Sequence, residues 1–184
     1  LPCYRGEVPV GEAVIRGMYD RFLKGKEYPL PLPEDPADDD DEAGAVYAAD
    51  PSLPLAWIVD IDGTLALRGE RGPFDWHRVR EDRPNRVVVD LVRGMSRARF
   101  GYRLGIIVMS GRDEVCRPET ERWLEDHRIH QTDLLMRSAG DVRRDDVVKR
   151  ELFFRYVAPK WNIVGVLDDR QRVVDMWRSI GLTC

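Results

Sequence analysis

The sequence predicts an α/β domain with a parallel sheet between two layers of helices, and two observations support this fold class. From residue 56 onward, apolar runs of strand length alternate with longer segments of helical periodicity, which is the pattern of right-handed βαβ units. Three of the apolar runs end in polar side chains. Because ligands bind beyond the carboxyl ends of strands in such folds, we expect a three-layer, Rossmann-like domain with its functional site at that edge.

The expected elements alternate along the chain without an internal repeat. Strands are expected at residues 56–61, 102–111, 132–137 and 161–169. Helices are expected at residues 84–101, 117–129, 144–158 and 170–181. Pro84 suits the first turn of the first of these helices, and Gly181 suits the end of the last.

The amino-terminal third differs from the rest of the chain in charge and composition. Residues 1–56 contain 12 acidic and 5 basic residues, whereas residues 57–184 contain 21 acidic and 24 basic residues. Apolar residues within 10–25 have helical spacing. Alternating prolines and four consecutive aspartates in 27–54 indicate an extended linker, with a cation site as the alternative. We therefore expect a helical segment over 1–26, a linker over 27–54 and the main domain over 55–184.

Composition excludes some classes of protein. No apolar run approaches the ~20 residues that a membrane span requires, so we expect no membrane partner. Cys3, Cys116 and Cys184 lie far apart and form no CxxC pair, which indicates a reducing compartment such as the cytoplasm and no zinc site. The chain begins with Leu1 rather than Met, so we expect a piece of a longer protein.

Polar residues end the first, second and fourth expected strands. They are Asp60 and Asp62, Ser110 and Arg112, and Asp168 and Asp169. Ordinary strand exits also favour Asp and Ser, but three such ends, two of them with acid pairs, indicate a site. Clustered carboxylates repel one another unless a cation compensates them, and ligands that are all oxygen favour Mg²⁺.

In a continuing strand, Asp60 and Asp62 of the run WIVDIDGTLA would share a face, because side chains two residues apart point the same way. The turn at Gly63 can re-aim one of them, which suits two separate roles. One carboxylate can attack phosphorus, and the other can protonate the leaving oxygen.

Four motifs in order resemble those of the haloacid dehalogenase superfamily of phosphohydrolases: DIDGTLA, MSGR, Lys149 in RRDDVVKRE, and VLDD. From about Ala56 to Cys184, longer stretches resemble the 3′-phosphatase domain of the phage polynucleotide kinase–phosphatases. The segment VPVGEAVIRGMYDRF resembles the end of that family's kinase domain, but the phosphate-binding motif GxxxxGK[ST] is not found. We therefore expect no kinase activity here, a covalently linked kinase domain in the full-length protein, and a host-cytoplasmic location if a phage encodes it.

The resemblance implies roles for the four aspartates. Asp60 would be the nucleophile that forms an aspartyl-phosphate. Asp62 would be the general acid and then the base, and its backbone carbonyl would contact Mg²⁺. Asp168 would complete the metal site, and Asp169 would ligate through water or orient its neighbours.

Further matched residues would bind the phosphate. Thr64 and Ser110 would donate hydrogen bonds to phosphate oxygens. Lys149 would point at the phosphate and at Asp60, offsetting the charge that develops during phosphoryl transfer. Asp145 lies one helical turn before Lys149 and would hold it in place, although a helix N-cap is the alternative for Asp145.

Arginines in the same stretches suit phosphate recognition, although solvated surface positions are the alternative for most of them. Arg71 and Arg112 match arginines that the family needs for catalysis, and each can form forked contacts to a phosphate. A salt bridge to Asp75 is the alternative for Arg71. Arg137 and Arg144 match less specifically and are interpreted as contacts to a nucleic-acid backbone.

The segment between Leu65 and Pro84 is too short for the large cap domain of many relatives, so the site is expected to be open. Arginines crowd this segment together with Phe74, Trp76 and His77, and such residues can grip a backbone and stack a base. The alternative is that Phe74 and Trp76 only pack this segment onto the sheet.

Together these features predict a Mg²⁺-dependent phosphatase that removes 3′-terminal phosphates, and possible 2′,3′-cyclic phosphates, from DNA or RNA ends. A capless phosphatase of small phosphomonoesters is the main alternative. A signalling receiver domain also combines acid pairs with a lysine, but its acceptor lies on a middle strand, whereas the middle strand here ends in Ser110. A binding remnant without catalysis fits poorly with a complete motif set.

Overall fold

A computed structural model describes residues 45–72, 74–97 and 104–184. The chain divides into two units, Leu1–Gly44 and Ala45–Cys184. The expected helix over 10–25 and most of the expected linker lie outside the described residues. No helix in the described ranges is long and apolar enough to cross a membrane.

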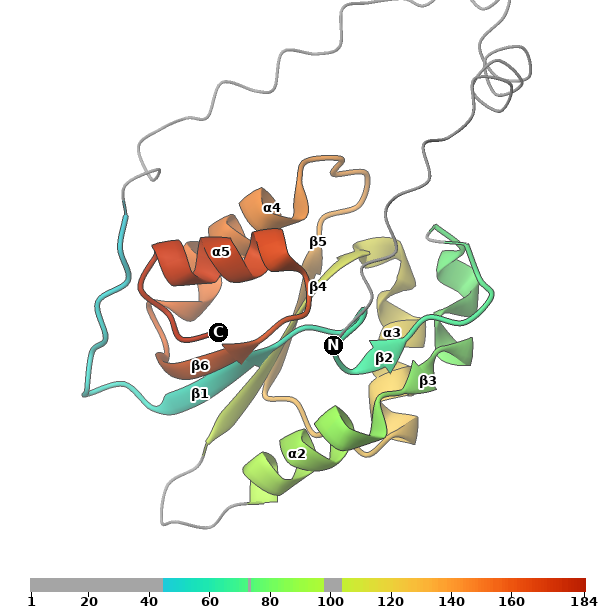
Figure 1. Cartoon of the computed structure of the whole chain (residues 1–184), viewed down its shortest axis with the longest axis horizontal. Helices are drawn as coiled ribbons and strands as arrows, with labels where there is room; N and C mark the ends of the chain where they lie inside the picture. Colours follow the sequence, from blue (N-terminus) through green and yellow to red (C-terminus); the bar gives the residue numbers. More distant parts are fainter. Residues whose placement is uncertain (1–44, 73, 98–103) are drawn as a thin grey trace, which may run out of the picture. The chain divides into compact units, whose positions relative to one another are not determined.

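A four-stranded parallel sheet forms the centre of the unit Ala45–Cys184 (Figure 1). Its strands, in spatial order, are β5 (Asp133–Arg137), β4 (Gly105–Asp113), β1 (Leu55–Val59) and β6 (Asn162–Leu167). β1 pairs with both β4 and β6, so the ends of the three motif-bearing strands lie side by side. The three-layer α/β prediction is thus confirmed in its sheet.

Helices cover both faces of the sheet. They are α2 (Arg86–Arg97) and α3 (Arg117–Asp126) on one face and α4 (Asp145–Leu152) and α5 (Gln171–Ser179) on the other (Figure 1). Each strand alternates its side chains between the two layers. In β1, Val59 joins the core that contains Trp123 of α3, while Ala56 and Ile58 join the core that contains Trp177 of α5.

Most of the expected elements end at other residues in the structure, and two of these differences shape the core and the site. The helix expected over 144–158 is α-helical only to Leu152 and continues as a π-helical turn over Phe153–Val157. This wider turn buries Phe153 in the core, edge-on to Trp177 at a centroid distance of 5.6 Å. β4 runs two residues further than expected, to Asp113, through a register irregularity that follows Ser110.

Residues 45–54, expected to belong to the linker, pack on the domain. The Tyr47 hydroxyl accepts a hydrogen bond from the Ile163 N–H at 3.0 Å and donates to the Trp161 carbonyl at 3.2 Å. The Tyr47 N–H donates to the Ile180 carbonyl at 2.8 Å, and its ring lies edge-on to Phe153. These contacts half-bury an aromatic side chain against the end of the fold, so residues from Ala45 onward pack with the unit Ala45–Cys184, and the domain boundary at residue 55 stays a prediction.

The segment over residues 65–84, here called the flap, is a short ribbon. β2 (Ala66–Leu67) pairs with β3 (Arg83–Pro84) in antiparallel fashion, and a 3₁₀ helix, Trp76–Glu81, lies between them. The described part of the flap therefore contains no separate cap domain, as its length predicted.

Candidate active site

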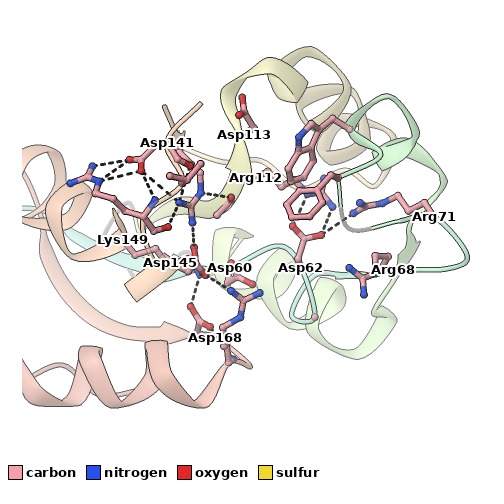
Figure 2. Close-up of a pocket in the computed structure, with 18 of the residues that line it drawn as sticks. Asp60, Asp62, Arg68, Arg71, Arg112, Asp113, Asp141, Asp145, Lys149 and Asp168 are labelled. Carbon is pink, nitrogen blue, oxygen red and sulfur yellow. Dashed lines mark hydrogen bonds and ion pairs between the residues drawn. The ribbon is translucent and has the colours of Figure 1, made fainter. Parts of the chain in front are cut away.

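A pocket of about 810 Å³ lies at the carboxyl edge of the sheet, where the three polar strand ends meet (Figure 2). The predicted site residues that line it are Asp60, Asp62, Arg71, Arg112, Asp145, Lys149 and Asp168. Five separate segments supply them, namely the ends of β1, β4 and β6, the helix α4 and the flap. Of the other predicted residues, Asp169 groups with Asp60 and Asp168, which line the pocket, whereas Thr64 and Ser110 are buried.

Lys149 connects the ends of β1 and β6. Its Nζ donates to Asp60 Oδ1 at 2.7 Å and to Asp168 Oδ2 at 2.8 Å. Asp60 is only 5% exposed and Lys149 only 1%. Asp145, one turn before Lys149 on α4, brings its Oδ2 within 3.7 Å of Nζ. The buried ammonium is thus held among carboxylates, as the helical spacing predicted.

Burial and charge perturb both members of the Asp60–Lys149 pair. Burial raises the pKa of Asp60 above its ordinary value, Lys149 opposes that shift, and Asp168 reinforces it. Burial alone would lower the pKa of Lys149, but the charges of Asp60, Asp168 and Asp145 outweigh it and raise that pKa. Lys149 therefore stays protonated and offers a fixed positive charge beside the Asp60 carboxylate.

Asp60, Asp168 and Asp169 fit a divalent cation. One carboxylate oxygen from each can be chosen so that all three lie within 4.8 Å of one another. When all three carboxyl groups are ionised, as a bound cation would favour, Lys149 compensates one of the three negative charges, which leaves two for the cation to neutralise. Hard oxygen donors with this excess charge are the chemistry that Mg²⁺ prefers. We call Asp60, Asp168, Asp169 and Lys149 the lysine centre.

The turn after β1 depends on Gly63, whose φ is +99°. A Cβ at this position would lie 2.0 Å from Asp169 Oδ2, so a side chain there would displace that carboxylate. The neighbouring Thr64 hydroxyl donates to Asp169 Oδ1 at 3.1 Å. In this structure Thr64 therefore orients Asp169, and phosphate binding by Thr64 stays a prediction.

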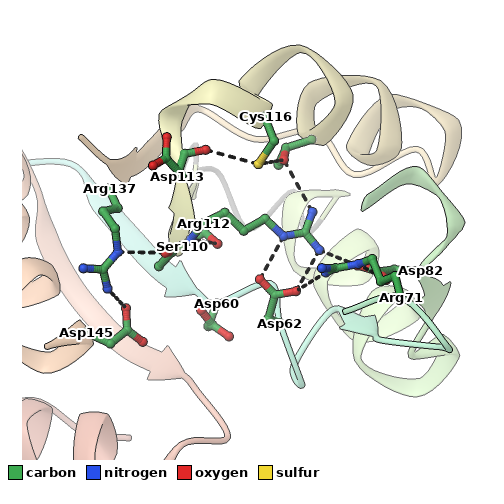
Figure 3. Close-up of polar contacts among 12 residues, drawn as sticks. Asp60, Asp62, Arg71, Asp82, Ser110, Arg112, Asp113, Cys116, Arg137 and Asp145 are labelled. Carbon is green, nitrogen blue, oxygen red and sulfur yellow. Dashed lines mark hydrogen bonds and ion pairs between the residues drawn. The ribbon is translucent and has the colours of Figure 1, made fainter. Parts of the chain in front are cut away.

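The Asp62 carboxylate points away from the lysine centre and into a network with two arginines (Figure 3). Arg112 donates to both Asp62 oxygens, with its Nε at 2.8 Å and its Nη2 at 2.9 Å. Arg71 Nη2 donates to Asp62 Oδ1 at 3.1 Å. Because the arginines engage the Asp62 side chain, the predicted contact of Asp62 to a metal is through its backbone carbonyl.

The Asp82 carboxylate accepts hydrogen bonds from both arginines and so anchors them. Arg71 forms a forked pair with it, with both contacts at 2.7 Å, and Arg112 Nη2 donates to Asp82 Oδ2 at 2.7 Å. Asp82 is 3% exposed, and Trp123 Nε1 fixes its backbone carbonyl at 2.8 Å. We call Asp62, Asp82, Arg71 and Arg112 the arginine centre, in which two negative charges balance two positive ones.

Sequence reasoning missed Asp82. The alternative for Arg71 named the wrong carboxylate, because Asp75 instead accepts a hydrogen bond from the Gly72 N–H at 2.8 Å. Buried guanidinium groups need carboxylate partners, and this rule predicts that a partner for Arg71 exists. It does not select among Glu70, Asp75, Glu81 and Asp82, because no motif marks Asp82 in the sequence.

The two arginines control the protonation of Asp62. Burial alone would raise the pKa of Asp62, but hydrogen bonds and charge from Arg112, together with the charge of Arg71, hold it below its usual range. Within this network Asp62 is therefore a carboxylate.

Asp145 is a connecting residue rather than a helix cap. The N-cap of α4 is Arg144, and Asp145 is the first helical residue. Its carboxylate accepts from Arg137 Nη2 at 3.3 Å and from Arg170 Nη1 at 3.1 Å. Arg137 also donates to the Gly111 carbonyl, and Arg144 pairs with Asp146. Protein acceptors thus engage the two arginines that were interpreted as nucleic-acid contacts.

Two further predictions meet mixed outcomes. Ser110 is fully buried, and its hydroxyl accepts from the Arg112 N–H at 3.2 Å, so this residue shapes the β4 exit. Trp76 packs against the core, as its alternative stated. Phe74 is 78% exposed and lines the pocket edge-on to Trp76, so packing alone does not account for Phe74.

A parallel sheet with two aspartates at the exit of β1 and a buried lysine from α4 is the haloacid dehalogenase-like arrangement that the sequence predicted. Residues 54–184 match the family described as "Polynucleotide kinase PNKP phosphatase domain". This match spans most of the chain, and the chain belongs to that family.

Three relatives agree with this assignment. A "Putative bifunctional polynucleotide kinase/RNA ligase" of Autographa californica nuclear polyhedrosis virus is 30% identical over 176 residues, which cover 94% of this chain and 22% of the viral protein. A chain in the structure of the Pnkp1/Rnl/Hen1 RNA repair complex is 37% identical with a TM-score of 0.70, covering 78% of this chain and 45% of that one. A second structure of the Pnkp1/Rnl/Hen1 complex is 32% identical with a TM-score of 0.70, covering 92% and 58%. The chain thus spans about a fifth of the viral relative and about half of each solved chain.

Proposed function

We propose that this domain is a Mg²⁺-dependent polynucleotide 3′-phosphatase that acts in nucleic-acid end repair through an aspartyl-phosphate on Asp60. The observation that carries the proposal is the pairing of two differently held carboxylates in one pocket of a chain of this family. Asp60 lies 2.7 Å from a buried ammonium, and Asp62 is held by two guanidinium groups. Bound Mg²⁺ would offset negative charge on Asp60 and on the phosphate.

In the first step, an Asp60 oxygen attacks phosphorus and the bond from phosphorus to the 3′-oxygen breaks. Lys149 offsets the charge that develops on the phosphoryl oxygens. The 3′-oxygen leaves with a proton from Asp62. In the second step, Asp62 takes a proton from water, which attacks phosphorus, releases phosphate and restores the Asp60 carboxylate.

Asp62 must hold a proton in the first step, although Arg112 and Arg71 lower its pKa. We propose that a bound phosphate draws part of the hydrogen bonding of both guanidinium groups toward its own oxygens. This change raises the pKa of Asp62, while Asp82 keeps the arginines anchored. Binding and proton transfer are thereby coupled through the same two side chains.

The direct test is incubation of the protein with a 3′-phosphorylated oligonucleotide and Mg²⁺, with release of inorganic phosphate as the measurement. We expect turnover with Mg²⁺ and none after chelation. No release by folded, Mg²⁺-loaded protein from DNA, RNA or 2′,3′-cyclic ends would contradict the proposal.

A phosphatase of small phosphomonoesters is the second candidate, because a pocket of about 810 Å³ lies in the range of small-molecule sites. Comparing kcat/KM for a 3′-mononucleotide and a 3′-phosphorylated oligonucleotide separates the two candidates. A clear preference for the mononucleotide would favour the small-molecule phosphatase. The linked kinase domain and the cytoplasmic location remain predictions.

A further inference from the structure

The two sides of the pocket differ in how their arginines are paired. On the side of the β5–α4 connection, Arg143 Nη2 pairs with Asp141 at 2.7 Å and with Glu151 at 2.8 Å. Arg170 pairs with Asp145 at 3.1 Å. Carboxylates thus already compensate the guanidinium groups on this side.

The flap side carries arginines of a different kind. Arg68, Arg83 and Arg86 are exposed, and none of them has an ion pair or hydrogen bond from its side chain to another described residue. Their neighbours Arg78 and Arg80 are paired, with Glu81 and Asp126 respectively. Within the described ranges, three exposed arginines without a paired carboxylate therefore lie on and just after the flap.

The backbones of these three positions lie close together in the flap and at the start of α2. Arg68 lines the pocket, beside Asp62 and Arg71 in Figure 2. The residue before it, Leu67, pairs with Arg83 across the β2–β3 ribbon. Arg86 begins α2 three residues after Arg83. We call Arg68, Arg83 and Arg86 the arginine track.

We infer that the strand upstream of the terminal phosphate leaves the pocket along the arginine track rather than over the β5–α4 connection. Each track arginine then contacts a phosphate of the backbone. A phosphodiester chain is the partner that this arrangement fits, because it repeats a negative charge from the phosphate pocket outward. The inference rests on the proposed function, and it specifies the route that the nucleic-acid strand takes from the pocket.

The test compares a 3′-phosphorylated single-stranded oligonucleotide with a 3′-mononucleotide, as the ratio of their kcat/KM values. We expect Arg68→Ala, Arg83→Ala and Arg86→Ala each to lower this ratio about two- to fivefold, because each substitution removes one exposed ion pair with a backbone phosphate. The triple variant is expected to lower it by about tenfold or more. Each removal should also flatten the slope of log KM for the oligonucleotide against log salt concentration by about 0.7.

Two comparisons make the result specific. Lys160→Ala removes an exposed charge just before β6, at the opposite edge of the sheet from the pocket, and should change neither substrate. Arg83→Lys keeps the charge and should retain most of the salt slope. Arg143→Ala on the β5–α4 side should lower the ratio less than any track variant does.

The outcomes separate this inference from the proposed function. If the wild-type protein releases no phosphate from any 3′-phosphorylated end, the proposed function fails. If the wild-type protein is active on the oligonucleotide but the triple track variant keeps its ratio and salt slope, the path is wrong. A larger loss for Arg143→Ala than for the track variants would place the strand on the other side and also overturn the inference.

Discussion

The lysine centre and the arginine centre use the same chemical groups in one pocket but differ in their balance of charge. In the lysine centre, one ammonium faces three carboxylates. In the arginine centre, two guanidinium groups face two carboxylates at 2.7–3.1 Å. The first centre is thus left with charge for a cation, whereas the second is complete within the protein.

This difference matches the work that each centre would do. Phosphoryl transfer needs positive charge beside the nucleophile and around the phosphate. The excess negative charge of the lysine centre suits it to bind a cation that would supply part of this positive charge. Proton transfer needs a carboxylate in a fixed position. Asp82 gives Asp62 that fixed position through Arg71 and Arg112.

The largest expected effect comes from Asp60→Asn in the lysine centre. The amide cannot attack phosphorus, so kcat should fall by more than about 10³-fold. Phosphate release from a 3′-phosphorylated oligonucleotide measures this, with circular dichroism as the control for folding. An active Asp60→Asn protein would remove the assigned nucleophile.

Breaking the arginine centre should cost stability as well as activity. Asp82→Asn leaves two buried guanidinium groups with one carboxylate, and we expect a loss of about 3–5 kcal/mol in the free energy of unfolding. Urea denaturation measures this loss, and kcat should fall in the folded fraction because Asp62 loses its support.

The matched control for Asp82→Asn is Glu81→Gln. Glu81 is the neighbouring acid and is exposed, with its only described ion pair to Arg78. This variant should change stability by no more than about 0.5 kcal/mol. Equal effects of the two substitutions would show that Asp82 is not the anchor.

Magnesium should stabilise the protein through the carboxylates of the lysine centre and the backbone carbonyl of Asp62, without the Asp62 side chain. At a concentration about 100 times its Kd, Mg²⁺ should add about 2.7 kcal/mol to the free energy of unfolding. The measurement is Tm with and without Mg²⁺. The shift should be strongly reduced in Asp168→Asn, which removes a ligand oxygen's charge, and retained in Asp62→Asn, which keeps its backbone carbonyl. Loss of the shift in Asp62→Asn but not in Asp168→Asn would reverse the assignment of the two centres.

The smallest expected effect tests whether either centre depends on the amino-terminal segment. Tyr47→Phe removes the hydroxyl that bonds to Ile163 and Trp161 but keeps the ring against Phe153. We expect a loss of about 1 kcal/mol in the free energy of unfolding, as for one hydrogen-bonding group. Thermal denaturation measures it, and kcat should stay within twofold because Tyr47 contacts neither centre.

The fold and the lysine centre could largely be predicted because their signals are local. Apolar runs marked each strand of the sheet, and the acid pairs stood at the strand ends that the parallel topology brings together. The spacing of Asp145 and Lys149 by one helical turn correctly placed both on one face of α4. Missed boundaries, such as the π-helical turn at Phe153, depend on how that ring packs against Trp177.

The sequence by itself determined the order of strands and helices, the acid pairs at the strand ends and the short flap, because these features are written in periodicity and in spacing along the chain. The tertiary structure alone decided that Asp82 anchors Arg71 and Arg112, that Asp62 faces those arginines, and that Tyr47 packs against Phe153. Each of these depends on which charged or aromatic group lies nearest in space. A chain with 29 basic and 33 acidic residues offers far too many possible pairs for spacing to choose among them.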